Sequence, residues 1–185
     1  RIKLFRTQLP QLSFTLNFLI EHATTDLLVR MDSDDLCEPM RFDRLVTVAM
    51  DSTADVFGSW ATIIDDNNMV LGHYSPPQST KALKNRMIYS SPVIHPTVLF
   101  RKRFWIESRG YLGGFVSEDF DMWLRGISRG AKIINIPEYL LRYRIHSSQV
   151  SRSRLGYAET AAHWYREFLL HPSWYNAFGW LTTSG

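Results

Sequence analysis

The chain has 185 residues, of which 45% are hydrophobic, and this length and composition suit one folded domain with a substantial core. Its formal net charge of only +3 argues against a dedicated nucleic-acid-binding protein but suits an anionic substrate such as a nucleoside diphosphate. The single cysteine, Cys37, excludes an internal disulfide, and no apolar run reaches the ~18 residues of a membrane span.

The first predicted element is a buried helix over residues 12–22, where leucine and phenylalanine side chains recur at helical spacing. Residues 26–31 form a short apolar segment that favours a strand. Pro39 then opens another helix, because proline suits the first helical position.

Three carboxylates, Asp32, Asp34 and Asp35, follow the predicted strand 26–31. Alternation along a strand points Asp32 and Asp34 the same way, and a divalent cation commonly relieves such like-charge repulsion. Ligands of an α/β sheet also bind at the carboxyl ends of its strands. The alternative is a solvated acidic turn that caps the helix at Pro39. Because the three carboxylates directly follow a buried strand, the sequence favours the metal site over the capping turn.

The sequence of the middle of the chain predicts a β-hairpin followed by alternating helices and strands. Strands are expected at 55–64, 69–73 and 94–101, and helices at 79–89 and 103–108. The first two strands form the hairpin, because a polar turn separates them.

Acidic residues gather at the start of the next predicted helix, which Ser117 is expected to cap and Gly130 to end. Such acids commonly only offset the helix dipole. The same position favours an ionised Asp119 near neutrality, whose carboxylate accepts a proton. The preceding loop contains Gly113 and Gly114 and can approach a ligand closely. Spacing alone leaves the two interpretations open.

Two strands are expected at 132–136 and 139–145, separated by Pro137, and the second ends in basic residues and a histidine. Arg144 and His146 share the end of this strand. A lone histidine is more often an ordinary hydrogen-bonding residue, but imidazole joining carboxylates around a metal suits Mn²⁺ better than Ca²⁺. Arginine can hold phosphate oxygens. Strands that alternate with helices predict an α/β sheet with an antiparallel portion.

Four segments in this order resemble the inverting family 2 glycosyltransferases of the GT-A fold that build bacterial surface polysaccharides. Residues 31–41, with the run Met-Asp-Ser-Asp-Asp, resemble the nucleotide-sugar and metal motif of that family. Residues 94–101 resemble its mid-domain strand, and residues 117–125 its acceptor-side motif with the catalytic base. Residues 143–151 resemble the ending of its bacterial members. The similarity runs over about residues 12–151.

The resemblance implies a GT-A-like mixed sheet flanked by helices, a UDP-sugar or other nucleoside-diphosphate-sugar donor, and Mn²⁺ or Mg²⁺. The donor-binding residues that it implies are Asp32, Asp34, Asp35, Arg41 and Arg144. The metal contacts would be Asp34 and His146.

Asp119 would be the catalytic base, which deprotonates the hydroxyl of a glycan or lipid-linked acceptor as it attacks the anomeric carbon. Attack opposite the leaving diphosphate inverts that carbon. The implied acceptor-binding residues are Glu118, Trp123, Gly113 and Gly114.

Members of the family normally begin with a strand, a helix and a second strand that hold the nucleoside. Residues 1–11 are too short for such a unit, which needs ~30 residues. We therefore expect a partial GT-A domain over 1–153, incomplete at its N-terminus, with weak nucleotide binding and an exposed sheet edge. Two alternatives are an inactive relative that acts only in binding, and a metal-dependent phosphohydrolase with Asp32 or Asp34 as nucleophile. The phosphohydrolase would need a phosphate-binding Ser/Thr and Lys arrangement, and no convincing one follows.

Residues 154–185 are expected to form a C-terminal helix, over 155–170, and an aromatic tail that packs on the domain. A second interpretation is a peripheral membrane contact, because aromatic rings favour the membrane interface. We expect a cytoplasmic protein, and this contact would hold it at the inner face of the cytoplasmic membrane, where a lipid-linked acceptor is accessible.

Overall fold

A computed structural model describes residues 2–146 and 154–184 of the chain. Its helices are α1 (Leu12–His22), α2 (Arg41–Asp51), α3 (Thr80–Met87), α4 (Lys102–Glu107), α5 (Glu118–Ser128), α6 (Arg154–Leu170) and α7 (Trp174–Thr183), with the 3₁₀ turn η1 (His95–Thr97). Its strands are β1 (Leu27–Val29), β2 (Leu36–Cys37), β3 (Val56–Ile64), β4 (Val70–Tyr74), β5 (Leu99–Arg101) and β6 (Ile133–Arg144).

The described strands form one mixed sheet in the order β1-β5-β3-β6-β2, with β4 paired to β3. The central pair β3–β6 is parallel, and the other pairs are antiparallel. The expected α/β sheet with an antiparallel portion is therefore confirmed. Within this sheet β1 pairs with β5 alone, so the strand that precedes the acidic residues lies at an edge.

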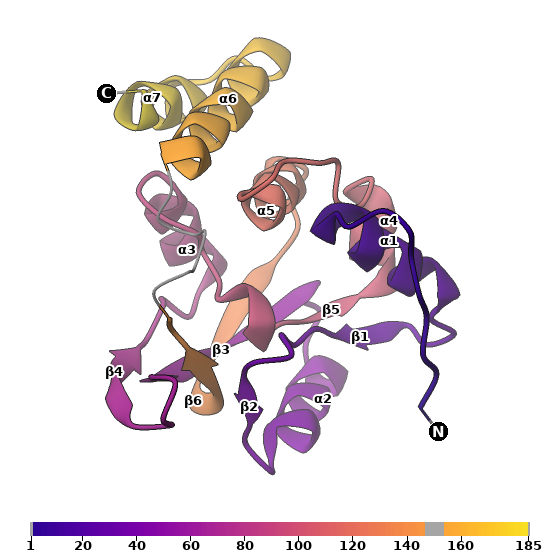
Figure 1. The fold of residues 1–185 in the computed structure, drawn as a ribbon. Coiled ribbons are helices and arrows are strands. Elements are labelled where there is room, and N and C mark those ends of the chain that lie inside the picture. Colours follow the sequence, from indigo (N-terminus) through magenta and orange to yellow (C-terminus); the bar gives the residue numbers. More distant parts are fainter. Residues whose placement is uncertain (1, 147–153, 185) are drawn as a thin grey trace.

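Helices cover both faces of the sheet (Figure 1). On one face α2 packs Leu45 and Ala49 against Phe57 of β3. On the other face, α3, α4 and α5 surround a larger aromatic cluster that includes Val56. Because side chains alternate along a strand, the neighbours Val56 and Phe57 serve opposite layers. The helices on the two faces of the sheet thus hold the strand ends, and the loops that follow them, in place.

Three of the expected strands differ in the structure. Residues 133–144 form one strand, β6, and its register against β3 shifts around Pro137, where Ser59 faces Ile136 but Trp60 faces Tyr139. The proline is thus absorbed in a bulge, where its missing N–H does no harm. The strand expected at 94–101 is shortened to β5, since Pro96 opens the 3₁₀ turn η1.

The aromatic tail forms helix α7, which packs against α6 and lies beyond α3 and α5 at one end of the molecule (Figure 1). Ser173 caps α7 by accepting a hydrogen bond from the N–H of Asn176 at 3.1 Å. Gly179 lies directly against Trp164, and a Cβ atom there would stand 2.5 Å from the indole ring. The tail also reaches the rest of the chain, as expected, because Trp164 packs edge-on against Phe120 at 6.2 Å between ring centroids and the Tyr175 hydroxyl donates to the carbonyl of Lys84.

Candidate active site

The three carboxylates after β1 converge. Ligand oxygens of Asp32, Asp34 and Asp35 all lie within 4.8 Å of one another. The next strand, β2, pairs with the end of β6 and draws this loop across the sheet edge. There Asp35 Oδ1 accepts a hydrogen bond from the backbone N–H of Arg144 at 2.8 Å. The pairing of a two-residue strand thus joins segments that are more than 100 positions apart.

His146 stands beside this acidic cluster, with its Nε2 3.5 Å from Asp34 Oδ2. The Asp34 side chain is 43% exposed, so it remains open to a ligand. Arg144 bonds to the same loop, because its Nε donates to the carbonyl of Asp34 at 2.8 Å and one Nη donates to Asn68 at 2.7 Å. The structure therefore brings together the two residues expected to bind a metal. Positions 147–151 of the expected motif lie outside the described residues.

The acidic cluster suits a divalent cation in its donor types and in its electrostatics. Burial raises the pKa of Asp35 to about 6; the N–H of Arg144 opposes the shift, and the charges of Asp32 and Asp34 add to it. Asp35 Oδ2 is buried and has no hydrogen-bond partner among the residues that the structure describes. A cation near these oxygens would relieve both features. Carboxylate oxygens with the His146 imidazole are ligands that suit Mn²⁺ or Mg²⁺.

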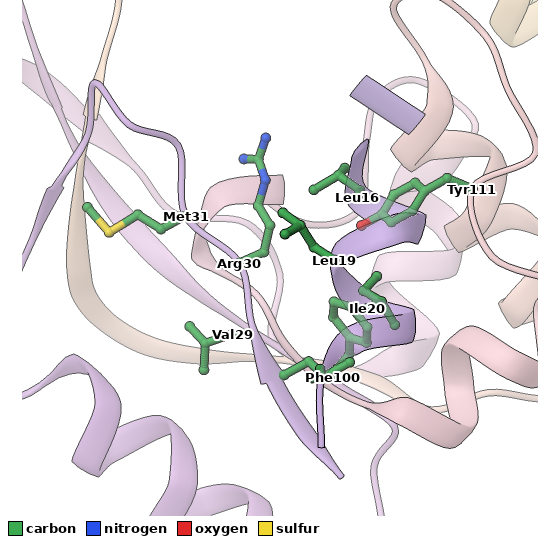
Figure 2. Close-up of a pocket in the computed structure, with 10 residues that line it drawn as sticks. Leu16, Leu19, Ile20, Val29, Arg30, Met31, Phe100 and Tyr111 are labelled. Atoms are coloured by element: carbon green, nitrogen blue, oxygen red, sulfur yellow. The ribbon is translucent and has the colours of Figure 1, made fainter. Parts of the chain in front are cut away.

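Arg30 is a site residue that the sequence analysis missed. Its guanidinium donates to Asp32 Oδ2 at 2.6 Å and lies 2.5 Å from Oδ1, and its side chain is only 9% exposed. Figure 2 shows Arg30 leaving the end of β1 beside Leu16 and Leu19 of α1, in a pocket of about 250 Å³ that Tyr111 also lines. The sequence did contain a signal for this residue, because alternation along a strand places Arg30 on the same face as Asp32.

A larger cavity, of about 950 Å³, connects the two ends of the candidate site. Arg30 and Asp32 line it from the β1 side, and Glu118 and Asp119 line it from the start of α5. His95 of η1 also contributes to its wall. Its volume lies in the range of pockets for small molecules and cofactors. The expected donor-side acid and the expected base thus face one common space.

The electrostatics of Asp119 differ from the sequence expectation. As expected, the helix N-terminus favours its charge, since Asp119 Oδ1 accepts a hydrogen bond from the N–H of Phe120 at 2.7 Å. Burial nevertheless outweighs this bond and the nearby charge of Arg30, and raises the pKa of Asp119. Burial, together with the Asp119 charge, raises the pKa of the neighbouring Glu118 to about 7. Elevated pKa values favour proton acceptance near neutral pH.

Arg41 does not reach the cavity. Its side chain has no exposed surface, and one Nη donates to the carbonyls of Arg30, at 2.7 Å, and Pro96, at 2.6 Å. The expected direct contact with the donor therefore has no support in this geometry. Arg41 instead fixes the backbone of Arg30, and so the start of the acidic loop.

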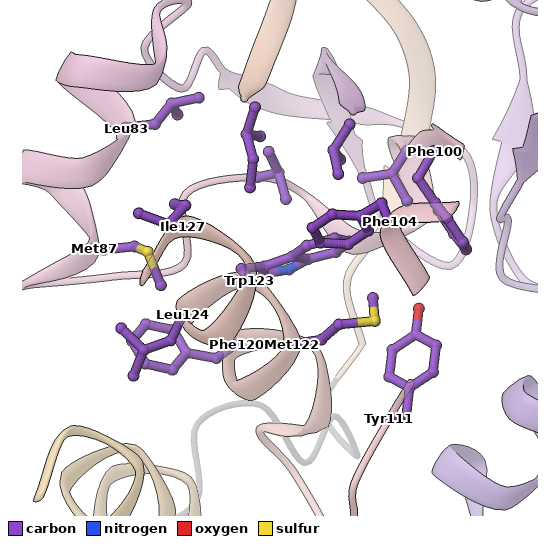
Figure 3. Close-up of a cluster of buried hydrophobic side chains, with 14 of the residues drawn as sticks. Leu83, Met87, Phe100, Phe104, Tyr111, Phe120, Met122, Trp123, Leu124 and Ile127 are labelled. Carbon is purple, nitrogen blue, oxygen red and sulfur yellow. The ribbon is translucent and has the colours of Figure 1, made fainter. Parts of the chain in front are cut away.

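Trp123 is likewise a core residue and not an acceptor platform. It is fully buried and stacks on Phe104, with ring centroids 5.8 Å apart (Figure 3). Helical spacing places it one turn after Asp119 on the same side of α5, but with its ring buried in the core. The motif alone does not show that this side of the helix faces the core at Trp123.

The loop before α5 holds both glycines expected on the acceptor side. Gly113 and Gly114 have φ values of +120° and +104°, a backbone region that other residues rarely adopt. Ser117 makes no side-chain cap to the described part of α5, so the expected cap is wrong. Its hydroxyl instead donates to Glu159 of α6 at 2.9 Å. The acceptor roles of the glycines stay predictions.

The chain is similar to known glycosyltransferases. The model of glycosyl transferase family 2 matches residues 1–110. The O-antigen biosynthesis glycosyltransferase WbnJ of Escherichia coli is 33% identical over 171 residues, which are 91% of this chain and 67% of WbnJ. The amylovoran biosynthesis glycosyltransferase AmsE of Erwinia amylovora is 31% identical, over 75% of this chain and 52% of AmsE. The chain thus spans about half to two thirds of the length of these relatives.

Among solved structures, S. aureus TarS 1-349 in complex with UDP-GlcNAc has a TM-score of 0.63 and 13% identity, over 99% of this chain and 62% of that chain. At this identity the likeness shows the fold alone, and it bears out the expected GT-A-like architecture. Among the helices that the structure describes, none combines the length and apolar character needed to cross a bilayer.

Proposed function

Because the chain belongs to glycosyl transferase family 2, we propose that it moves a sugar from a nucleoside-diphosphate-sugar donor to a hydroxyl of a glycan or lipid-linked acceptor, with inversion and with a divalent metal. One observation carries this proposal: Asp32 and Asp119 line the same 950 Å³ cavity from two different elements. Direct displacement of the diphosphate by an acceptor hydroxyl needs at least a donor-binding acid and a base that face the same cavity. Family membership leaves the phosphohydrolase alternative without support.

In the proposed reaction Asp34, Asp35 and His146 would hold the metal, and the Arg30–Asp32 pair forms the adjoining wall. A bound divalent cation would neutralise charge on the leaving diphosphate. Asp119 accepts the proton of the acceptor hydroxyl. The oxygen then bonds to the anomeric carbon as the bond to the diphosphate oxygen breaks, and attack from the opposite face inverts the centre. A positioned base of this kind contributes roughly 10²- to 10⁴-fold to the rate.

The relatives support the choice of substrates. The TarS structure is named as a complex with UDP-GlcNAc, which supports a UDP-sugar as donor. WbnJ and AmsE are named for O-antigen and amylovoran biosynthesis, which supports a surface polysaccharide as product. We extend both features to this chain as part of the proposal.

The proposal includes peripheral contact with the inner face of the cytoplasmic membrane. Trp174, Phe178 and Leu181 are exposed and recur at helical spacing on α7, and Trp174 is 92% exposed. Such a stripe of apolar and aromatic side chains suits the membrane interface. It would place the cavity near a lipid-linked acceptor.

The decisive experiment uses the full-length protein. Membrane lipid extracts are incubated with a panel of radiolabelled UDP-sugars and Mn²⁺, and the organic phase is counted. Metal-dependent labelling that Asp119→Asn abolishes would support the proposal. If no donor labels any acceptor fraction while UDP still binds, the alternative of an inactive binding relative is correct.

A further inference from the structure

Helix α6 supplies the anchor for the start of α5 that Ser117 does not. Glu159 Oε1 accepts a hydrogen bond from the N–H of Phe115 at 2.8 Å. Its Oε2 accepts from the N–H groups of Val116 and Ser117, both at 3.1 Å, and from the hydroxyl of Ser117 at 2.9 Å. One carboxylate therefore receives four hydrogen bonds from three consecutive residues.

This arrangement is a backbone nest occupied by an anionic side chain. Successive N–H groups that point to one centre attract negative charge, and bonds to an ionised acceptor are stronger than neutral ones. Burial alone would raise the pKa of Glu159, but the bonds from Phe115, Ser117 and Val116 outweigh it and hold that pKa below its usual value. Glu159 therefore stays ionised at neutral pH, as the nest requires.

The anchored segment is otherwise poorly determined by its own sequence. It follows Gly113 and Gly114, whose freedom gives the loop many alternatives. The fit is nevertheless close, because a Cβ atom on Gly114 would lie 3.2 Å from Glu159 Oε2. Order in this loop thus depends on a contact from α6.

The contact reaches the base through the first turn of α5. The carbonyl of Ser117 accepts the N–H of Asp121 at 3.0 Å, so the residue held by Glu159 also begins the helix. Asp119 lies between these two. A second tie joins the same helices, since Arg166 of α6 lies 2.6 Å from the buried Asp121 Oδ1. The first turn of α5 is therefore fixed to α6 on both sides of Asp119.

We infer that Glu159 is a positioning residue that holds Asp119 at the cavity by anchoring residues 115–117. The inference rests on the proposed function and extends it, because it gives a residue of α6 a part in orienting the base. Helix α6 therefore helps to orient the base.

The test compares Glu159→Ala and Glu159→Gln in the full-length protein, with Glu21→Ala, an exposed carboxylate on α1, as the matched control. We expect Glu159→Ala to lower kcat roughly 10- to 100-fold, as for a misplaced catalytic group, with the donor KM within about twofold. Glu159→Gln keeps one oxygen for the three bonds at Oε2 and loses the Phe115 bond, so its loss is smaller. The control keeps its kcat.

Hydrogen exchange followed by mass spectrometry supplies the second readout. We expect faster exchange in the peptide over residues 115–120 in both Glu159 variants, with β3 and β6 unchanged. An unchanged kcat in Glu159→Ala, or faster exchange throughout the sheet, overturns the inference. If the wild-type protein transfers no sugar, the proposed function fails. The exchange experiment still decides the anchor, because wild-type exchange over 115–120 in Glu159→Ala, which removes all four bonds, would refute it.

Discussion

Arg30 holds both carboxylate oxygens of Asp32, at 2.6 and 2.5 Å, inside the cavity that Asp119 also lines. The same positive charge opposes the burial that raises the pKa values of Asp119, Glu118 and Asp35. One nearly buried guanidinium therefore acts on both the donor-side and the acceptor-side acids. Its position links the protonation of the candidate base to the geometry of the donor loop.

Arg30→Met should move the acidic limb of the kcat–pH profile to higher pH. Without the guanidinium charge, the ionised form of Asp119 loses a stabilising interaction, so its pKa rises further. Arg30→Lys should leave the limb near its wild-type position, because the charge remains. The measurement is kcat between pH 5 and 9 at saturating donor. A limb that shifts to lower pH would contradict this electrostatic role.

Asp119→Asn should lower kcat by roughly 10²- to 10⁴-fold and leave the dissociation constant of the donor nearly unchanged. The amide keeps the shape of the side chain but cannot accept the proton. Calorimetric titration with UDP and a transfer assay measure the two quantities, and Asp43→Asn on the exposed side of α2 is the control. Equal losses of binding and turnover would show that Asp119 has no separate role as base.

Asp34→Ala should weaken metal-dependent donor binding by at least about tenfold, the scale seen when support for a metal site is lost. The variant removes the exposed oxygen next to His146 and leaves the Arg30–Asp32 pair intact. UDP titrations with Mn²⁺ and with EDTA test this, and Asp66→Ala in the hairpin turn is the control. We expect the Asp34 variant in Mn²⁺ to resemble the wild type in EDTA. A retained Mn²⁺ effect would move the metal to other residues.

Double substitution of Trp174 and Phe178 by alanine should reduce binding to anionic liposomes severalfold. The two side chains make up much of the exposed apolar stripe on α7. Flotation of the full-length protein with vesicles measures the effect, and Tyr89→Ala, an exposed ring near α3, is the control. Equal flotation of all three proteins would end the proposal of membrane contact.

Sequence reasoning placed the elements of the fold well where periodicity and chain breakers agree. The helix expected over 12–22 is found at those residues, and β3 and β4 form the expected hairpin on either side of the polar turn. It failed around Pro137, because a bulge in a long strand and a break between two strands have the same local signature. It also missed β2, since two residues carry no period and their pairing with β6 is set by the tertiary fold.

The candidate site was predictable to the level of motifs but not of side-chain surroundings. Spacing and resemblance indicated Asp34, His146 and Asp119, and the structure brings their segments to one region. Arg41 and Trp123 belong to the same motifs yet are fully buried, because a motif does not record which side of an element faces the core. The Glu159 anchor lay beyond local reasoning, since it joins positions more than 40 residues apart.

Glu118→Gln should stabilise the folded chain at pH 8 and have little effect at pH 4. Burial raises the pKa of Glu118 to about 7 in the folded state, from an ordinary value of 4.5. The folded protein therefore binds this proton more tightly than the unfolded chain does. That contribution to stability is fully present below pH 4.5 and is lost as the pH rises through 7, where the ionised carboxylate must stay buried beside Asp119.

The glutamine carries no such penalty, so the free energy of unfolding of the variant should exceed that of the wild type at pH 8 by at most about 3 kcal/mol. Urea unfolding at pH 4, 6 and 8 measures the difference. Other titrating groups are common to both proteins and cancel in this comparison. If this difference in the free energy of unfolding instead grew toward low pH, the fold would stabilise the charged form of Glu118. The pKa of Glu118 would then be lowered and not raised, and the start of α5 would not favour proton acceptance.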